Sequence, residues 1–111
     1  MPEPSLFIYK IQLVRHDMLT EGATPEEDGI LSEHFSYLEG FTLAGVVHLA
    51  GRTLTPDYAD FGNIIFSSES EQAARQLVRN DPAVKNRVMR AELYPFRASL
   101  VGKLPAPPEV A

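Results

Sequence analysis

The chain has 111 residues and no cysteine, and its 10 basic and 15 acidic side chains give a formal net charge of −5. This length favours one domain with a modest core. The acidic balance argues against a nucleic-acid partner, because binding to a phosphate backbone needs clustered Lys and Arg. The absence of cysteine excludes disulfides, thiolate metal ligands and a cysteine nucleophile.

The apolar run near the start of the chain lacks the features of a targeting segment. Residues 2–4 read Pro-Glu-Pro in place of a basic region, and no small-residue cleavage site follows. No apolar stretch approaches the roughly 20 residues that a membrane-spanning helix needs. We therefore expect a cytoplasmic, soluble protein without a membrane partner.

Residues 6–14, LFIYKIQLV, predict the first strand because they are rich in β-branched and aromatic side chains. Apolar side chains at alternate positions, Tyr9 among them, share one face of this strand. Leu6 and Ile8 make the second face partly apolar, which indicates that something covers that side too. Residues 15–23 follow as a polar connection.

Residues 24–27, Thr-Pro-Glu-Glu, carry two helix-start signals, a capping box and a proline at the first helical position. They predict a helix over about 25–44, ended by Gly45 in a left-handed cap. The apolar stripe of this helix consists of Ile30, Leu31, Phe35, Leu38 and Phe41. His34 falls on the same face and therefore interrupts a stripe that should be buried.

Residues 46–51 and 61–66 predict two further strands, which pair antiparallel across a loop. A capping box at residues 68–71, Ser-Glu-Ser-Glu, predicts the start of a second helix. This helix must stop at residues 80–82, Asn-Asp-Pro, because proline cannot continue it and pushes the preceding residue toward extended geometry. Residues 88–96 predict the fourth strand.

The order strand, helix, strand, strand, helix, strand is the split βαβ pattern of the ferredoxin-like fold, an α+β architecture. It consists of an antiparallel four-stranded sheet with two helices on one face. The other face is bare and partly apolar, so we expect a homodimer through the open sheet face. We place the domain at residues 1–97. Residues 98–111 form a Pro-rich tail, either disordered or laid across a neighbouring subunit.

The chain has three histidines, of which one is well placed for an acid–base pair. His16 lies in a polar loop and should be solvated. Alternation puts His48 on the strand face opposite its two apolar neighbours, where it could serve a site or a dimer interface. The ring nitrogens of His34 need partners, either from the backbone or from a carboxylate. Asp81 is the candidate carboxylate, because the two helices lie side by side in this fold.

Four stretches of the chain resemble the YCII-related (YciI-like) family: residues 33–38 (EHFSYL), 44–51 (AGVVHLAG), 68–73 (SESEQA) and 81–84 (DPAV). Residues 92–96, ELYPF, resemble the closing strand of the family, so the resemblance covers roughly residues 6–97. It implies a ferredoxin-like domain that dimerises sheet to sheet into an α+β barrel. It also implies an active site made of a helix-one histidine and the Asp-Pro aspartate, here His34 and Asp81.

The chain departs from the pattern of the family at two places. Arg52 follows Gly51 where the family commonly has proline, and Arg52 could bind an anionic substrate or be a solvated loop residue. Residues 86–87, Asn-Arg, stand near where the family commonly has glycine.

These residues favour a small dimeric enzyme that uses His34 as general acid or base and Asp81 to orient it. The chemistry would be isomerisation, elimination or lyase chemistry on a small anionic or aromatic metabolite, without metal or cofactor. Tyr9, His48 and Arg52 are the candidate substrate contacts. The alternative is a non-catalytic dimeric module for ligand binding or protein interaction, in which the pair is structural. A metal site is a third option, although two ligands are too few to close one.

Overall fold

The computed structural model describes residues 5–107, and its main elements follow the predicted order. They are β1 (Ser5–Leu13), α1 (Met18–Glu21), α2 (Pro25–Leu43), β2 (Val47–Arg52), β3 (Gly62–Ser68), α3 (Glu71–Asn80), α4 (Pro82–Lys85) and β4 (Met89–Phe96). Residues 1–4 and 108–111, where the predicted domain begins and the predicted tail ends, lie outside the described residues.

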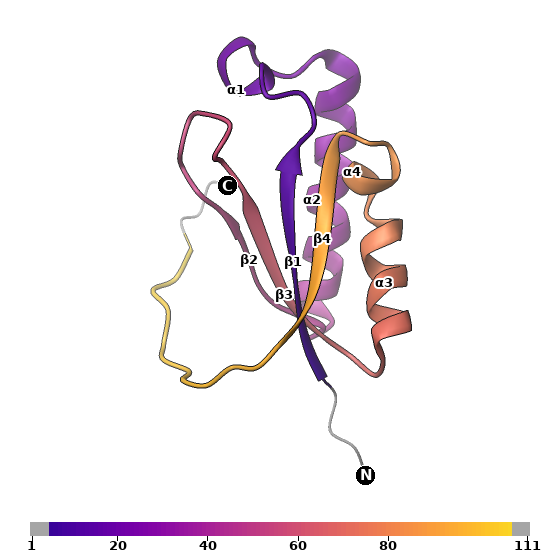
Figure 1. Cartoon of the computed structure of the whole chain (residues 1–111), viewed down its shortest axis with the longest axis vertical. Coiled ribbons are helices and arrows are strands. Elements are labelled where there is room, and N and C mark those ends of the chain that lie inside the picture. Colours follow the sequence, from indigo (N-terminus) through magenta and orange to yellow (C-terminus); the bar gives the residue numbers. More distant parts are fainter. Residues whose placement is uncertain (1–4, 108–111) are drawn as a thin grey trace.

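The four strands form one antiparallel sheet in the order β2-β3-β1-β4. The central strands are β1 and β3. The chain passes from β1 through α2 to the edge strand β2, and from β3 through α3 to the edge strand β4. The helices α2 and α3 lie on one side of the sheet and leave the other side bare (Figure 1). This arrangement confirms the ferredoxin-like α+β fold that the element order predicts.

The core lies between the sheet and the two long helices. Phe66 of β3 is at its centre, with ring centroids 5.9 Å from Phe7 and 5.7 Å from Tyr9. The buried cluster consists of Phe7, Tyr9, Ile11, Leu38, Val47, Ile64, Phe66, Ala74 and Val78. Burial of each large apolar side chain in such a cluster contributes about 1.5–3 kcal/mol to stability. The strand face with Tyr9 is therefore the inner face.

The start of α2 follows the capping signals closely. Thr24 accepts the backbone N–H of Glu27 at 3.1 Å, and the Glu27 carboxylate accepts the backbone N–H of Thr24 at 2.9 Å. Arg15 adds a two-point contact to the same carboxylate, at 2.6 and 2.9 Å. These contacts, with Arg15 the largest cause, lower the pKa of Glu27 to about 2. Gly45 has φ 79°, as expected for a left-handed helix end.

Two predictions about the connections are wrong. The segment 15–23 is not only a polar connection, because it contains α1, which buries Met18. The start of α3 is capped by Ser70 and not by Ser68, which is the last residue of β3. Ser70 has extended backbone geometry, and its hydroxyl accepts the backbone N–H of Ala73 at 3.0 Å. Ala73 occupies the position three residues after Ser70, and its side chain cannot accept a hydrogen bond. No reciprocal capping box therefore forms.

A bulge in β2 also changes the predicted face of one residue. Val47 pairs with Phe66 and Leu49 pairs with Ile65, so His48 is an extra residue between two pairs. Paired residues share a face, and Leu49 therefore joins Ile65 on the bare face. The Nε2 atom of His48 lies 2.5 Å from the hydroxyl of Ser67, which belongs to the same face. The prediction that His48 and Leu49 point to opposite faces is wrong, because strict alternation does not hold across a bulge.

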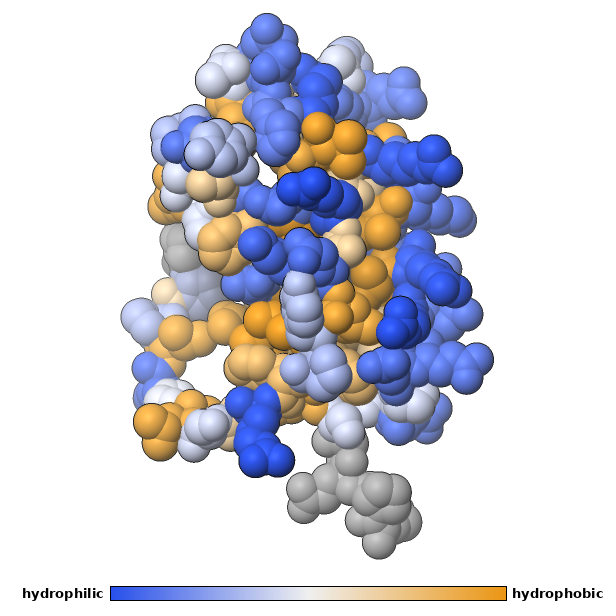
Figure 2. All heavy atoms as spheres, viewed as in Figure 1, coloured by the Kyte–Doolittle hydropathy of each residue, from blue (hydrophilic) through white to orange (hydrophobic). Residues whose placement is uncertain are grey.

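The bare face of the sheet is divided into an apolar and a polar half (Figure 2). We call the apolar half the apolar patch; it consists of Leu6, Ile8, Leu49, Ile65 and Phe96. The polar half carries Lys10, Gln12, Arg90 and Glu92. Leu49 and Phe96 are 43% and 37% exposed. The patch is therefore a continuous apolar surface that no part of the described chain covers fully.

The tail leaves the end of β4 and runs outside the sheet on the β2 side (Figure 1). Residues 98–107 form no helix or strand, and Leu100 and Val101 are 95% and 85% exposed. Over residues 5–107 no helix combines the length and the apolar character needed to cross a bilayer.

Candidate acid–base site

Asp81 occupies the junction between α3 and α4 and caps both helices. Its backbone has φ −61° and ψ 122°, the extended geometry expected of a residue before proline. Its Oδ1 atom accepts the backbone N–H of Ala83 at 3.0 Å, which makes Asp81 the N-cap of α4. The break that Pro82 forces on the chain is therefore the same feature that turns the carboxylate inward.

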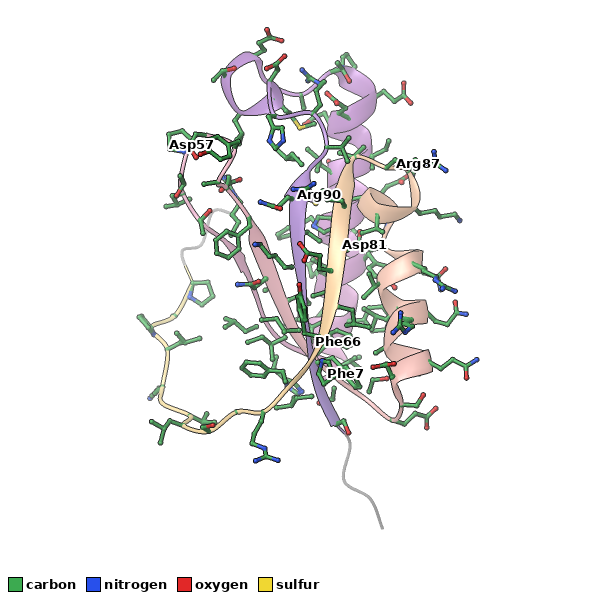
Figure 3. The ribbon with its side chains drawn as sticks, viewed as in Figure 1. Phe7, Asp57, Phe66, Asp81, Arg87 and Arg90 are labelled. Atoms are coloured by element: carbon green, nitrogen blue, oxygen red, sulfur yellow. The ribbon has the colours of Figure 1, made fainter. Side chains whose placement is uncertain are left out.

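The side chain of Asp81 is the one fully buried charged group among residues 5–107, with 0% exposure. Its Oδ1 atom lies 2.6 Å from Nδ1 of His34 on α2. Its Oδ2 atom accepts the hydroxyl of Tyr9 on β1 at 2.9 Å. Together with the N–H of Ala83, these contacts satisfy both oxygens of a carboxylate whose burial would otherwise cost several kcal/mol. Figure 3 shows Asp81 at mid-height of the sheet, between Arg87 at the upper end and Phe7 at the lower end.

His34 closes this arrangement from the outside. Its side chain is 12% exposed, whereas that of Asp81 is fully covered. An ionised carboxylate can only accept, so the Nδ1 atom that faces Asp81 must carry a proton. The neutral imidazole then has its lone pair on Nε2. No hydrogen bond to Nε2 occurs within residues 5–107, so this nitrogen is available to a ligand.

Tyr9 lies deeper than the sequence alone indicates. Its ring has no exposed surface, and its hydroxyl is committed to Asp81. Burial, and next the charge of Asp81, raise the pKa of Tyr9 far above its ordinary value. In this structure Tyr9 therefore offers no surface to a substrate, whereas the sequence predicted it as a substrate contact. The alternation of β1 places the Tyr9 hydroxyl inside, where it needs a buried acceptor, but it does not identify that acceptor as Asp81.

No hydrogen bond or ion pair joins the other two candidate substrate contacts, Arg52 and His48, to the pair. Arg52 is exposed at the end of β2 and pairs with Gly62, which in turn pairs with Ile11 of the inner face. Arg52 therefore lies on the helix side of the sheet. The Arg52 side chain makes no hydrogen bond or ion pair with any of the described residues. His48 lies on the bare face, so the sheet separates it from His34. Within one chain His48 cannot contact a ligand bound at His34.

Two surface hollows adjoin α2, and His34 lines neither of them. One is an open hollow lined by Leu31, Ser32, Phe35 and Ser36, which flank His34 in the helix. The other lies at the upper end of the molecule and is lined by Val14, Arg15, Thr24, Glu26, Glu27, Ile30, Asn86, Arg87 and Val88. The His34 side chain is 12% exposed, and a ligand can reach the ring through this exposed part. Within residues 5–107 no three His, Asp or Glu side chains cluster closely enough to hold a metal ion.

The fold and the pair together define a small ferredoxin-like α+β domain with an imidazole–carboxylate pair between its helices and its sheet. The sequence matches the YCII-related domain over residues 11–97. The chain belongs to the YCII-related family.

Solved structures with the same fold include two that cover most of this chain. A 5-chloro-2-hydroxyhydroquinone dehydrochlorinase from Burkholderia phenoliruptrix, in complex with 2,5-dihydroxybenzoquinone, has a TM-score of 0.62 and 20% identity over 83% of this chain and 93% of that chain. An uncharacterized protein from Thermotoga maritima has a TM-score of 0.56 and 10% identity over 86% of this chain and 100% of that chain. At these identities the likeness shows the fold alone. A search of curated proteins finds no match.

Proposed function

We propose that this protein is a small enzyme in which His34 acts as general acid and base and Asp81 holds it in place. One observation carries the proposal: a fully buried carboxylate lies 2.6 Å from Nδ1 of a ring that is still partly exposed. A carboxylate with this burial fixes the tautomer of the imidazole and stabilises the imidazolium that forms when Nε2 takes a proton.

The proton moves between His34 and the substrate. Nε2 removes a proton from a hydroxyl or C–H group, and the imidazolium then returns it to a second atom in an isomerisation. In an elimination the leaving group departs as an anion, and the proton passes from His34 to solvent. Asp81 keeps its contact with Nδ1 throughout. Proton transfer by a positioned side chain contributes about 10²–10⁴-fold, which suits a substrate that is already activated.

We propose small hydroxylated aromatic or quinonoid compounds as the substrate class. The dehydrochlorinase that shares this fold is named for 5-chloro-2-hydroxyhydroquinone and is bound to 2,5-dihydroxybenzoquinone, and both compounds belong to this class. Leu31 and Phe35 supply apolar surface beside His34. Arg52, exposed on the helix side of the sheet, is the proposed contact for an anionic oxygen of such a substrate.

We also propose that two copies pair through the apolar patch, as two sheets facing each other. Large apolar patches on a small domain mark interaction surfaces. A second copy offers the same patch and can cover it by two-fold symmetry. His34 lies on the helix side, so this pairing leaves its exposed edge free.

The second candidate function is a non-catalytic dimeric module in which the pair is structural. Two observations favour it: Asp81 already caps α4 and anchors β1, and His34 lines neither hollow. In that case the pair would serve only to join α2 to the junction of α3 and α4.

Turnover separates the two candidates. Wild type and His34→Gln are incubated with 5-chloro-2-hydroxyhydroquinone and with related chlorinated and hydroxylated hydroquinones, and quinone absorbance is followed. Gln can still donate to Asp81, so the fold should survive while the basic nitrogen is lost. We expect wild-type turnover and a loss of about 10²–10⁴-fold in His34→Gln, with His16→Gln as the unchanged control. No turnover by wild type, or equal turnover by His34→Gln, would favour the structural module.

A further inference from the structure

The buried hydroxyl of Tyr9 has no role in the proton transfer itself. It is nevertheless the hydrogen-bond donor to one of the two oxygens of the Asp81 carboxylate. The Tyr9 hydroxyl donates to Oδ2, while Oδ1 receives both His34 and the N–H of Ala83. The two oxygens therefore have different partners from different elements: Oδ2 faces the sheet and Oδ1 faces the helices.

The position of the hydroxyl is fixed by the core. Tyr9 lies in a central strand, has no exposed surface, and packs its ring edge-on against Phe66 at 5.7 Å between centroids. The packed Tyr9 ring cannot shift to keep its hydrogen bond if the Asp81 carboxylate moves. A partial rotation of the carboxylate about its Cβ–Cγ bond would move both oxygens away from their partners and break both sets of contacts.

We propose that Tyr9 is a positioning residue: it locks the Asp81 carboxylate in one orientation and withdraws part of its charge, and thereby sets how strongly the imidazole of His34 holds a proton. This inference rests on the proposed acid–base function. It assigns to Tyr9 a role toward the pair, and not contact with the substrate.

The hydroxyl is a constant donor over the working pH range. Burial and the neighbouring carboxylate raise the pKa of Tyr9, so its proton stays in place well above neutral pH. The other titratable group that senses the charge of Asp81 is Tyr37 of α2, whose pKa is raised to about 12, first by burial and then by Asp81. The other ion pairs within residues 5–107, Arg15 with Glu21 and Glu27 and Arg75 with Glu71, include no member of this group.

Removal of the Tyr9 hydroxyl should act on His34 in two ways. The Oδ2 atom loses its donor, so more negative charge remains to attract a proton to the imidazole. The carboxylate also becomes free to rotate, which weakens the hold on the Nδ1 proton. Both effects pass through Asp81, because Tyr9 itself makes no hydrogen bond to His34.

The test is nuclear magnetic resonance of the ¹⁵N-labelled full chain, in which three histidines give separate ring signals. In Tyr9→Phe we expect the midpoint of the His34 protonation curve to move up by about half to one pH unit. Exchange of its Nδ1 proton with water should become about tenfold faster. His16 and His48, neither of which contacts Asp81, should not change.

Tyr37→Phe is the matched control. It removes a half-buried hydroxyl that donates to the backbone carbonyl of Leu77 at 2.6 Å and makes no hydrogen bond to Asp81. We expect the His34 signals of Tyr37→Phe to match wild type, even if stability falls. Unchanged His34 signals in a folded Tyr9→Phe, or an equal change in Tyr37→Phe, would overturn the proposal.

A second measurement covers the case in which Tyr9→Phe does not fold. Replacement of tyrosine by 3-fluorotyrosine in the Tyr37→Phe background keeps the shape and makes the Tyr9 hydroxyl a stronger donor. The His34 midpoint should then move down, and no movement would contradict the inference. Neither experiment needs a substrate, so the failure of this inference is distinguishable from a failure of the proposed function, which turnover measures.

Discussion

At the scale of single residues, the arrangement depends on how a buried carboxylate is satisfied. Asp81 has three hydrogen-bond partners from three places in the chain. Without Asp81, each of them would lose this hydrogen bond. The Tyr9 hydroxyl and the Ala83 N–H are both covered, so neither can turn to water. The pair is therefore a structural feature as well as a candidate for chemistry.

Asp81→Ala should destabilise the protein by about 3 kcal/mol, because it leaves a buried hydroxyl and a buried N–H without acceptors. Asp81→Asn should cost about half as much, because its amide oxygen can still accept one of these bonds. Urea unfolding followed by circular dichroism measures both. Asp28→Ala, at an exposed position in the first turn of α2, is the control and should stay within about 0.5 kcal/mol of wild type. A loss below about 1 kcal/mol in Asp81→Ala would contradict this account.

At the scale of elements, helix ends decide where the site residues point. The short helix α4 begins at the Asp81 cap and ends in a Schellman motif, in which Val88 N–H bonds to Ala83 C=O and Arg87 N–H bonds to Val84 C=O. Arg87 takes the left-handed position of this motif, with φ 60°. Glycine is the usual residue there, because a side chain makes this conformation unfavourable.

Arg87→Gly should therefore stabilise the protein by about 0.5–1 kcal/mol through relief of backbone strain. The measurement is the free energy of unfolding in urea. Lys85→Gly is the contrasting variant, because Lys85 lies within α4 and its replacement should destabilise by a similar amount. If Arg87→Gly lowers stability, the Arg87 side chain contributes contacts that outweigh the strain.

The start of α2 should control stability in acid. Arg15 and the capping box hold the pKa of Glu27 at about 2, below its ordinary 4.5. A lowered pKa means that the ionised Glu27 stabilises the fold above pH 4.5, and that this stability is lost as the pH falls through about 2. Glu27→Gln should lower the thermal midpoint at pH 7 and flatten its dependence on pH between 4.5 and 2. Glu26→Gln serves as control. If the thermal midpoint of Glu27→Gln falls between pH 4.5 and 2 as steeply as that of wild type, Glu27 is not the group responsible.

Much of the fold and part of the site could be predicted from the sequence. Alternation identifies the strands, the Thr24 capping box starts α2, and Pro82 marks the break at Asp81. The meeting of His34 and Asp81 could be inferred from the side-by-side helices and the family resemblance. Three features could not be predicted. The bulge at His48 leaves no mark in the alternation, α1 is anchored by the single buried side chain of Met18, and the contact of Tyr9 with Asp81 depends on packing between distant elements.

At the scale of the whole molecule, we propose separate roles for the helix side and the bare side of the sheet. The pair lies on the helix side, and the apolar patch lies on the opposite, bare face of the sheet, part of whose apolar surface can be seen in Figure 2. Assembly and chemistry can then be changed independently. Variants of the patch should alter the oligomeric state without an effect on the His34 signals.

Ile65→Asp should dissociate the proposed dimer, because it places a charge at the centre of the patch and two like charges near the two-fold axis. Sedimentation velocity over a concentration series should show a dimer for wild type and a dissociation constant at least about 100-fold weaker for Ile65→Asp. Arg75→Asp, on the exposed side of α3, is the charge-change control. A monomeric wild type, or an unaffected Ile65→Asp dimer, would rule out pairing through this face.

The most direct test of the acid–base site is the tautomer of His34 in the wild-type protein, read from a long-range ¹H–¹⁵N spectrum above neutral pH. The geometry predicts a proton on Nδ1, bonded to Asp81, and an unprotonated Nε2 whose signal responds when the solution is made acidic. A proton on Nε2 above neutral pH would contradict the site, because the ring would then have no free nitrogen for a substrate. An Nε2 signal that stays constant between about pH 5 and 9 would also contradict it, because such a ring does not exchange protons near neutral pH.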